Sequence, residues 1–483
     1  MASLLRPPRF ARLVGLSVAL ASLNACGDAA KPAAAPVAPA PSGAAVTASP
    51  APDAGPAAPS LPPGVPDSPA GHQLAWVMGA LGQPPTEADV SARFADGFTA
   101  QVPPAQIVAI LSKLGAQLMP AVIDRVEAQT PEKVVAVVRS ARVPGGPKLR
   151  VSLAVEEAEP HKIKGLLFRP TVDAKPAASW DEVQTGLRAV APSVSFLAAD
   201  VAGGKCAPIS AIEPKKALAL GSAFKLYILE ALAAQIAAGK HSWDDPIAIE
   251  DKNKSLPSGD MRNEPAGKTF TVRQFAEKMI SVSDNTATDH LLAFVGRAAV
   301  EDAVKSSGHA SPARNVPFLS TRDVFALKLL GTADELHGYV AADVPHRRKL
   351  LESFEQRDLS SVPLEEHGWS RPRMIDSIEW FASPEDLCKL MVALKARADA
   401  PATAPVGAIL SINPGLPDEA GAYKYVAFKG GSEPGVMNLT WLLQRKSDEK
   451  WVFLTIGFND TGAAIDETKA IAAASVAREF LGK

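Results

Sequence analysis

The pattern of hydrophobic and polar positions divides the chain into four stretches. An apolar segment near the N-terminus is followed by residues 26–70, which are rich in Pro and Ala and contain no aromatic residue. A stretch of this composition cannot bury a core and is expected to stay extended. Regular apolar spacing begins near Gly71 and changes character near Trp180. The pattern therefore predicts two folded domains, residues 71–178 and 179–483, behind a linker.

The first predicted domain combines helical and strand spacing. Apolar residues recur every three or four positions, as in helices, in residues 72–81, 86–94 and 104–118. Apolar and polar residues alternate in residues 149–155, and residues 134–138 and 163–168 are further strand candidates. Helices followed by a small antiparallel sheet predict an α+β domain.

The second predicted domain has strands at both ends and helices between them. Residues 194–201 and 206–212 have strand character, and residues 226–238 are almost wholly apolar, which predicts a buried helix. Strands and then an amphipathic helix are expected near the C-terminus, over residues 425–428, 439–443, 451–458 and 465–480.

A serine and a lysine stand at the start of the buried helix. Ser222 and Lys225 are three residues apart, a spacing that places two side chains on one helix face, within contact. A serine hydroxyl needs a nearby base, and a lysine serves when burial disfavours its charged form. The free N–H groups of a helix start suit a developing oxyanion. Taken alone, the pair also fits a capping serine and a lysine that extends to solvent.

Two further motifs follow in order. Ser283-Asp284-Asn285 precedes an apolar helix, and Lys429-Gly430-Gly431-Ser432 ends a strand. S-x-x-K, S-D-N and K-[TS]-G in this order are the signature of class A β-lactamases and penicillin-binding proteins. The chain from about residue 180 therefore resembles the class A β-lactamase-like serine hydrolases. It is most similar to a subgroup in which this domain follows a small steroid-isomerase-like, cystatin-like domain, as in a clavulanic-acid-cluster hydrolase.

The resemblance implies a fold and a set of roles. The fold would be a five-stranded antiparallel sheet with helices and a helical subdomain. Ser222 would be the acylated nucleophile, Lys225 its base and Ser283 the proton relay to the leaving group. The backbone N–H groups of Ser222 and Ser432 would form the oxyanion hole. The substrate-binding residues would be Asn285, Lys429, Gly431 and Ser432.

The sequence departs from a β-lactamase at two places. Gly430 replaces the hydroxyl residue that helps to hold a substrate carboxylate, which puts a preference for penicillin-like acids in doubt. Class A enzymes also use a glutamate to activate the deacylating water, and residues 311–323 contain none. Asp323 is expected to begin a helix. Glu433 is a conceivable substitute for the missing glutamate, but it is expected at the surface. Efficient penicillin turnover is therefore not expected. The long stretch 331–380 suggests an extra lobe beside the site or, equally, a solvated insertion.

Composition and charge exclude several other classes. Hydrophobic residues make up 47% of the chain, enough for a large core, and 50 basic against 52 acidic residues argue against nucleic acid as a partner. The chain has no H-E-x-x-H, paired C-x-x-C, Walker loop or G-x-G-x-x-G, so neither a metal nor a cofactor is expected. Cys206 and Cys388 could pair in an oxidising compartment, and two buried thiols are the expectation.

The N-terminus predicts export. Residues 1–25 combine three arginines with a short apolar segment and lead to Cys26. This pattern resembles a bacterial lipoprotein signal, with Cys26 as the lipidated residue, although Asn24 is not the usual small residue. Plain signal cleavage is the alternative. The expected location is the cell envelope, with a lipid anchor as the membrane partner.

The expected function is that of an exported serine hydrolase that forms an acyl-enzyme at Ser222 on an ester or amide, β-lactams included. One alternative is a cell-wall enzyme that acts on D-Ala-D-Ala peptides. A second is a non-catalytic binding lipoprotein of the cell envelope.

Overall fold

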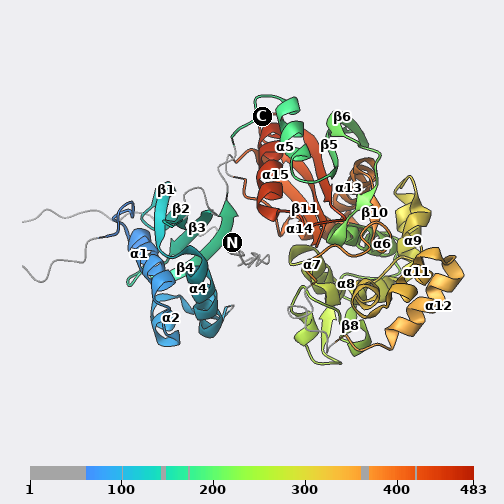
Figure 1. Cartoon of the computed structure of the whole chain (residues 1–483), viewed down its shortest axis with the longest axis horizontal. Coiled ribbons are helices and arrows are strands. Elements are labelled where there is room, and N and C mark those ends of the chain that lie inside the picture. Colours follow the sequence, from blue (N-terminus) through green and yellow to red (C-terminus); the bar gives the residue numbers. More distant parts are fainter. Residues whose placement is uncertain (1–60, 101, 143–147, 172–174, 360–368, 419–420) are drawn as a thin grey trace, which may run out of the picture. The chain divides into compact units, whose positions relative to one another are not determined.

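The protein is described by a computed structural model that covers residues 61–100, 102–142, 148–171, 175–359, 369–418 and 421–483. The chain divides into two compact units, Met1–Val172 and Asp173–Lys483 (Figure 1). The predicted export signal, Cys26 and most of the predicted linker lie outside the described residues.

The first unit is the predicted α+β arrangement. Four helices, α1 (Pro69–Gly82), α2 (Glu87–Arg93), α3 (Asp96–Thr99) and α4 (Pro104–Leu118), precede the sheet. The strands β1 (Ala121–Thr130), β2 (Lys133–Ser140), β3 (Lys148–Val155) and β4 (Ile163–Thr171) pair in chain order, all antiparallel. Apolar residues at alternate positions of β2 and β3 form a core with α1 and α4.

The strand β1 and the short helix α3 are the elements of this unit that the sequence pattern did not predict, and β1 is the larger of the two. The second half of β1 is mostly exposed, and the strand carries the charged residues Asp124, Arg125 and Glu127. Two register shifts interrupt its pairing with β2. Because each irregularity exchanges the faces of the strand, no clean alternation of apolar and polar residues survives in the sequence.

The second unit has a five-stranded antiparallel sheet in the order β11-β12-β13-β5-β6. These strands are β5 (Ser193–Ala202), β6 (Lys205–Ile212), β11 (Tyr423–Glu433), β12 (Val436–Arg445) and β13 (Trp451–Asn459). Short two-stranded pairs add β7 (Leu218–Ala219) with β10 (Phe381–Ala382), and β8 (Pro246–Ala248) with β9 (Thr269–Thr271).

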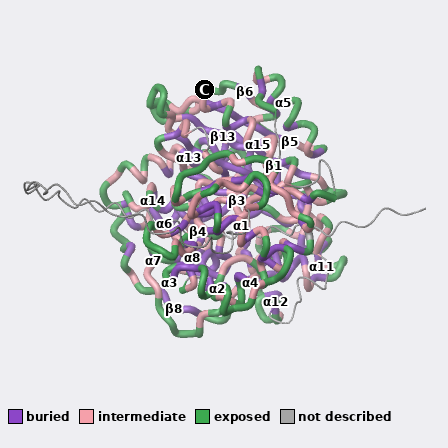
Figure 2. The backbone as a smooth tube through the Cα atoms, turned by 90° about the vertical axis from the view of Figure 1, so that its left-hand side faces the viewer, coloured by how far each residue is buried: buried purple, intermediate pink, exposed green. Residues whose placement is uncertain are grey.

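Helices cover both faces of this sheet (Figure 1). On one face, α5 (Trp180–Arg188) and α15 (Glu467–Leu481) form one core with the strands. The other face packs against a larger helical core. Buried residues, purple in Figure 2, lie in the interior, and exposed residues, green, lie toward the outside. The helices of the larger core are α6 (Lys225–Ala237), α7 (Val272–Ser281), α8 (Asn285–Val295), α9 (Arg297–Ser306), α10 (Thr321–Phe325), α11 (Ala333–Ala341), α12 (Val344–Glu355), α13 (Pro384–Asp399) and α14 (Pro405–Ser411). The fold is the expected β-lactamase-like one.

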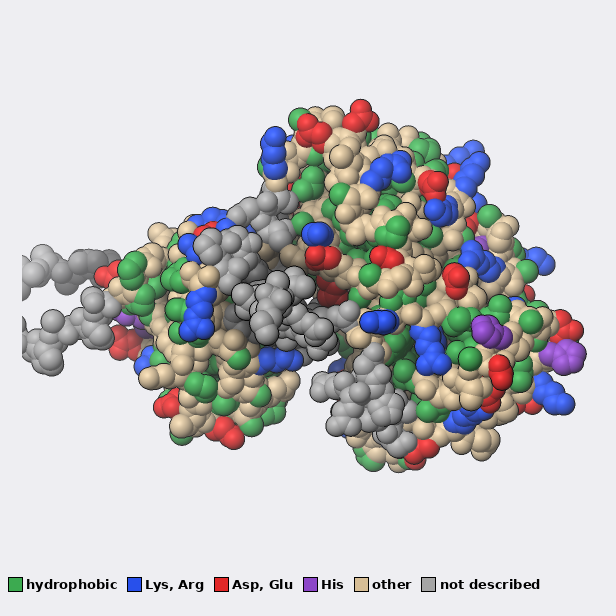
Figure 3. All heavy atoms as spheres, in the orientation of Figure 1, with side chains coloured by type: hydrophobic (Ala, Val, Ile, Leu, Met, Phe, Trp, Pro, Cys, Tyr) green, Lys and Arg blue, Asp and Glu red, His purple; other side chains and the backbone are tan. Residues whose placement is uncertain are grey.

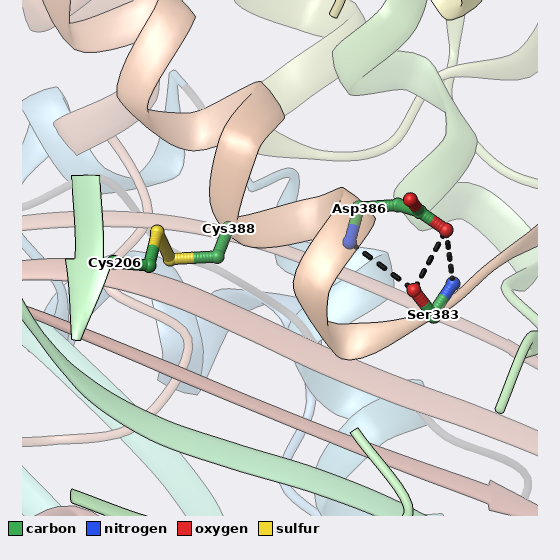
Figure 4. The surroundings of a disulfide bond; sticks show 4 residues. All are labelled: Cys206, Ser383, Asp386 and Cys388. Atoms are coloured by element: carbon green, nitrogen blue, oxygen red, sulfur yellow. Dashed lines mark hydrogen bonds between the residues drawn. A yellow bond between two sulfur atoms is a disulfide. The ribbon is translucent and has the colours of Figure 1, made fainter. Parts of the chain in front are cut away.

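Cys206 and Cys388 form a disulfide (Figure 4), so the expectation of two buried thiols was wrong. Cys206 lies on the edge strand β6 and Cys388 on α13, which packs across that strand, and their Cα atoms are 6.5 Å apart. The two residues are 182 positions apart in sequence. Neither hydrophobic spacing nor motif order carries information about such a long-range contact.

The stretch between α10 and β10 is a helical lobe that shares the core of the second unit. Leu336 and Tyr339 of α11 and Leu351 and Phe354 of α12 are all buried in that core. The alternative of a merely solvated insertion therefore does not describe these two helices. Before the lobe, Asp323 lies in the first turn of α10, where the sequence predicted the start of a helix, and it completes the capping box with Ser320.

The surface of the second unit carries a mixture of charges. Basic and acidic side chains are interspersed over the face seen in Figure 3, in keeping with the small net charge of −2. No helix within the described ranges combines the length and the apolar character needed to span a bilayer.

Candidate active site

Ser222 lies in a tight 3-10 turn, η1 (Gly221–Phe224), that leads directly into α6. Gly221 has a φ of +49°, a conformation that side chains rarely adopt. A methyl group added at Gly221 would lie 2.8 Å from the backbone nitrogen of Ser432, and one at Gly431 would overlap the nitrogens of Ser222 and Ala223. The two glycines therefore allow β11 to touch the turn that carries the serine.

Lys225 is the first residue of α6 and is completely buried. Its Nζ lies 2.6 Å from the carbonyl oxygen of Ser283, 3.0 Å from Ser283 Oγ and 2.7 Å from Asn285 Oδ1. A neutral amine has two N–H donors and one lone pair. The carbonyl and the amide oxygen can accept the two N–H groups, and the hydroxyl of Ser283 is the one partner able to donate to the lone pair. The three contacts thus suit an uncharged lysine.

The electrostatic surroundings favour the same state. Burial, with a smaller contribution from the Lys429 ammonium, holds the pKa of Lys225 well below its usual range, against the opposing effect of Asp284 and Asp289. Burial also lowers the pKa of Lys429, to about 7. Burial therefore favours the uncharged form of Lys225, which a base requires, while Lys429 carries the positive charge of an anion-binding group below about pH 7.

Ser283 joins the two lysines. Lys429 Nζ lies 3.1 Å from Ser283 Oγ, and it donates to the Gly430 carbonyl at 2.6 Å. Ser283 has a φ of +59°, a left-handed conformation that costs a non-glycine residue about 1–2 kcal/mol. Ser258 Oγ donates to the Ser283 carbonyl at 2.6 Å and helps to hold it there. Strain maintained by specific contacts is typical of functional positions.

Hydrogen bonds and close packing fix the position of the S-D-N segment. Asp284 caps α8 by accepting from Ala287 N, and its second carboxylate oxygen accepts from Met261 N at 2.9 Å. A methyl group at Gly259 would overlap the Asp284 side chain, so the glycine permits this close packing. Asn285 donates to the Leu256 carbonyl. The buried Asp284 is therefore structural, and it presents Ser283 and Asn285 to Lys225.

The structure thus brings together the side chains of Lys225, Ser283, Asn285 and Lys429, from three distant parts of the chain. Ser222 is half-buried, and no hydrogen bond joins its hydroxyl to Lys225 or to any other residue that the structure describes. The spacing argument placed Ser222 and Lys225 in contact, whereas the lysine is turned toward Ser283.

Glu433 is not at the surface, so that expectation was wrong. Its side chain is 8% exposed, and its Oε1 lies 2.5 Å from Lys328 Nζ. The same Nζ is 3.3 Å from Oε1 of the buried Glu379. Sequence reasoning missed Lys328 and Glu379 because each stands in a helical or loop context without a motif. Among the described residues, no group of three or more His, Cys, Asp or Glu side chains is arranged to hold a metal ion.

Two family models match the chain. Residues 179–403 match the model of the β-lactamase enzyme family, and residues 65–163 match a model described as ORF 12 gene product N-terminal. The second unit belongs to the β-lactamase enzyme family. A search of curated proteins found no match.

Several solved structures are similar to the chain. The β-lactamase from Sphaerobacter thermophilus DSM 20745 is 18% identical over 63% of this chain and 96% of its own, with a TM-score of 0.42. The β-lactamase from Desulfarculus baarsii DSM 2075 is 19% identical over 64% and 100%, with a TM-score of 0.43. A protein named PBP-A is 14% identical over 64% and 97%, with a TM-score of 0.43.

Proposed function

We propose that the protein is an exported serine hydrolase that forms an acyl-enzyme at Ser222 on a small ester or amide, with β-lactams among the candidate substrates. The observation that carries the proposal is the environment of Lys225. It is a buried amine with a lowered pKa, three residues from a serine hydroxyl that has no hydrogen-bond partner among the described residues. Burial of this kind favours the uncharged lysine, which can act as a base. The Cys206–Cys388 disulfide supports the export part, because disulfides persist mainly in oxidising compartments.

In the acylation step, the Ser222 oxygen attacks the substrate carbonyl carbon while its proton passes to Lys225. The negative charge that develops on the carbonyl oxygen is stabilised by the backbone N–H groups of Ser222 and Ser432, on the two segments that Gly221 and Gly431 bring together. The bond to the leaving group then breaks. Its proton is supplied from Lys225 through Ser283, whose oxygen lies 3.0 Å from the amine.

Substrate positioning is assigned to the remaining polar groups. Asn285 has its amide oxygen on Lys225 and its nitrogen on a loop carbonyl, so it fixes the base and lines the site at the same time. Lys429, below a pH of about 7, offers positive potential to a substrate carboxylate. Gly430 has no hydroxyl that could bind the substrate carboxylate together with Lys429.

The proposal is tested by intact-mass measurement after incubation with a fluorophosphonate and with a fluorescent penicillin. The wild-type protein should gain one adduct, and Ser222→Ala should gain none. Ser353→Ala is the matched control and should gain the adduct, because it removes an exposed hydroxyl of α12 that lies outside the site. Failure of both probes to modify the correctly folded wild-type protein would remove the basis of the proposal.

We expect kcat/KM to depend on the charge of Lys429 for acidic substrates only. The folded-state pKa of Lys429 is lowered to about 7, so its charge is present below that pH and is lost above it. The ratio of kcat/KM for a carboxylate-bearing ester to that for its neutral analogue should fall about tenfold per pH unit above about pH 7. In Lys429→Ala the ratio should be low and constant. A constant ratio in the wild type from pH 6 to 9 would contradict this role.

A cell-wall peptidase is the second candidate. It is favoured by one observation: among the described residues, no carboxylate hydrogen-bonds the Lys225 amine, and transfer of an acyl group to another amine does not need a base for water. Release of D-alanine from a D-Ala-D-Ala peptide, lost in Ser222→Ala, would support this candidate.

A further inference from the structure

Glu433 lies on the face of β11 that looks toward the site. Ala427 belongs to the helical core and Phe428 to the core on the opposite face of the sheet. Because side chains alternate along a strand, Lys429, Gly431 and Glu433 share the face of Ala427. Lys429 reaches Ser283 and Gly431 lies against the Ser222 turn. Glu433 is therefore the next group in that row, directly after Ser432.

Three charged side chains meet at this point. Lys328 from the π-helical turn Ala326–Leu330 contacts Glu433 at 2.5 Å and Glu379 at 3.3 Å. The side chains of Lys328 and Glu379 are 0% and 1% exposed. Two carboxyl groups share one ammonium here, away from water, and the Trp369 ring lies 5.8 Å from Lys328 Nζ. Burial, followed by the neighbouring Glu379 charge, raises the pKa of Glu433 well above its usual range.

The same cluster also holds the turn that carries the nucleophile. Glu379 accepts from the backbone N–H of Trp380 at 3.0 Å, and the Trp380 carbonyl accepts from Leu220 N at 2.9 Å. Leu220 immediately precedes the Gly221–Phe224 turn. The cluster is thus linked through Trp380 to the segment that precedes Ser222. One of its members, Glu433, directly follows Ser432 in the chain.

We propose that Glu433 is a positioning residue for acyl transfer, which holds the Ser432 N–H beside Ser222 through Lys328 and Glu379. This inference rests on the proposed function. The two N–H groups assigned to the oxyanion hole belong to different segments, and the three side chains tie those segments together. Precise placement matters because an oxyanion donor acts in the transition state, where its loss typically costs about 100- to 1,000-fold in kcat.

The charge of the cluster makes this role dependent on pH. The groups that face Glu433 are the Lys328 ammonium and the Glu379 carboxyl, and the nearby Trp369 is uncharged. With Glu433 protonated, one cation faces one anion. Since the folded-state pKa of Glu433 is raised, its contribution to stability is present below the unfolded value and is lost as pH rises through the folded value. A second buried negative charge then repels Glu379.

The test compares Glu433→Gln, Glu433→Ala and the exposed control Glu449→Ala in burst-phase acylation by p-nitrophenyl acetate, with thermal unfolding of each variant. Glutamine imitates the protonated acid and should keep the wild-type acylation rate at pH 6 to within about twofold. Alanine should lower the acylation rate constant by about tenfold or more, with KM changed less than about twofold, because the oxyanion donor acts in the transition state. The ratio of the Glu433→Gln rate to the wild-type rate should rise with pH.

Each outcome is informative. If the wild type forms no acyl-enzyme, the proposed function fails and this inference fails with it. If the wild type is acylated at Ser222 and Glu433→Ala keeps the wild-type rate, only the positioning role is overturned. A Glu433→Gln variant as slow as Glu433→Ala, or a ratio that stays constant with pH, also overturns it, because a purely structural effect would not distinguish the neutral amide from the protonated acid.

Discussion

Replacement of Lys225 by methionine is expected to slow acylation of Ser222 by at least about a thousandfold, because residues that act as one catalytic unit show losses of this order. Methionine preserves most of the buried volume and removes the amine. Lys225 is 0% exposed, and its amine is held by the carbonyl and hydroxyl of Ser283 and by Asn285.

Lys225→Arg separates charge from basicity. A guanidinium keeps a cation at the site and does not deprotonate in proteins, so this variant should be as slow as Lys225→Met if the lysine is the base. The measurement is the second-order rate constant of fluorophosphonate labelling. Lys278→Met, on the exposed side of α7, is the control and should label like the wild type.

The wild-type rate should rise with pH as Lys225 loses its proton. Its pKa is lowered by burial and by the neighbouring Lys429, so the uncharged, reactive form is present well below the ordinary lysine range. In Lys225→Met the labelling rate should no longer rise with pH in this way. A labelling rate that Lys225→Met leaves within about tenfold of the wild type would assign the base to another group, since loss of a general base alone costs about 100-fold or more.

The sequence predicted the parts of the site that depend on residue type and order. The three motifs gave Lys225, Ser283, Asn285 and Lys429, and the structure brings these four side chains together. Helical spacing predicted α4 with the bounds that it has, because that helix presents a regular apolar face to the core of the first unit.

Other features depend on contacts that no local pattern encodes. Glu433 has the sequence context of a strand end beside a turn, where a glutamate is usually solvated. Its burial is decided by Lys328, 105 positions earlier, in a lobe whose place in the fold is set by the helical core. The side-chain direction of Lys225 is a similar case. Helical spacing puts Lys225 on the same face as Ser222, but its amine donates to the carbonyl of Ser283, which has a left-handed conformation.

The acyl-enzyme is expected to hydrolyse at least about 100-fold more slowly than it forms, because a placed general base contributes about 100- to 10,000-fold and the described residues do not supply one. Two buried carboxylates on α8 and α10 already have partners. Asp289 accepts from the backbone N–H groups of Thr321 and Arg322, each at 2.8 Å. Asp323 is paired with Arg297 at 3.0 Å.

Slow hydrolysis has a kinetic signature. Nitrocefin should give a burst of product equal to the enzyme concentration and then a much slower steady state, and intact mass should show the adduct persisting after the burst. Ser222→Ala should give neither phase. Turnover without a burst would mean that a base for water exists after all. In that case Glu433→Gln becomes the deciding variant: if it restores the burst by stopping hydrolysis, the buried carboxyl beside Ser432 activates water, and if it does not, the base lies elsewhere.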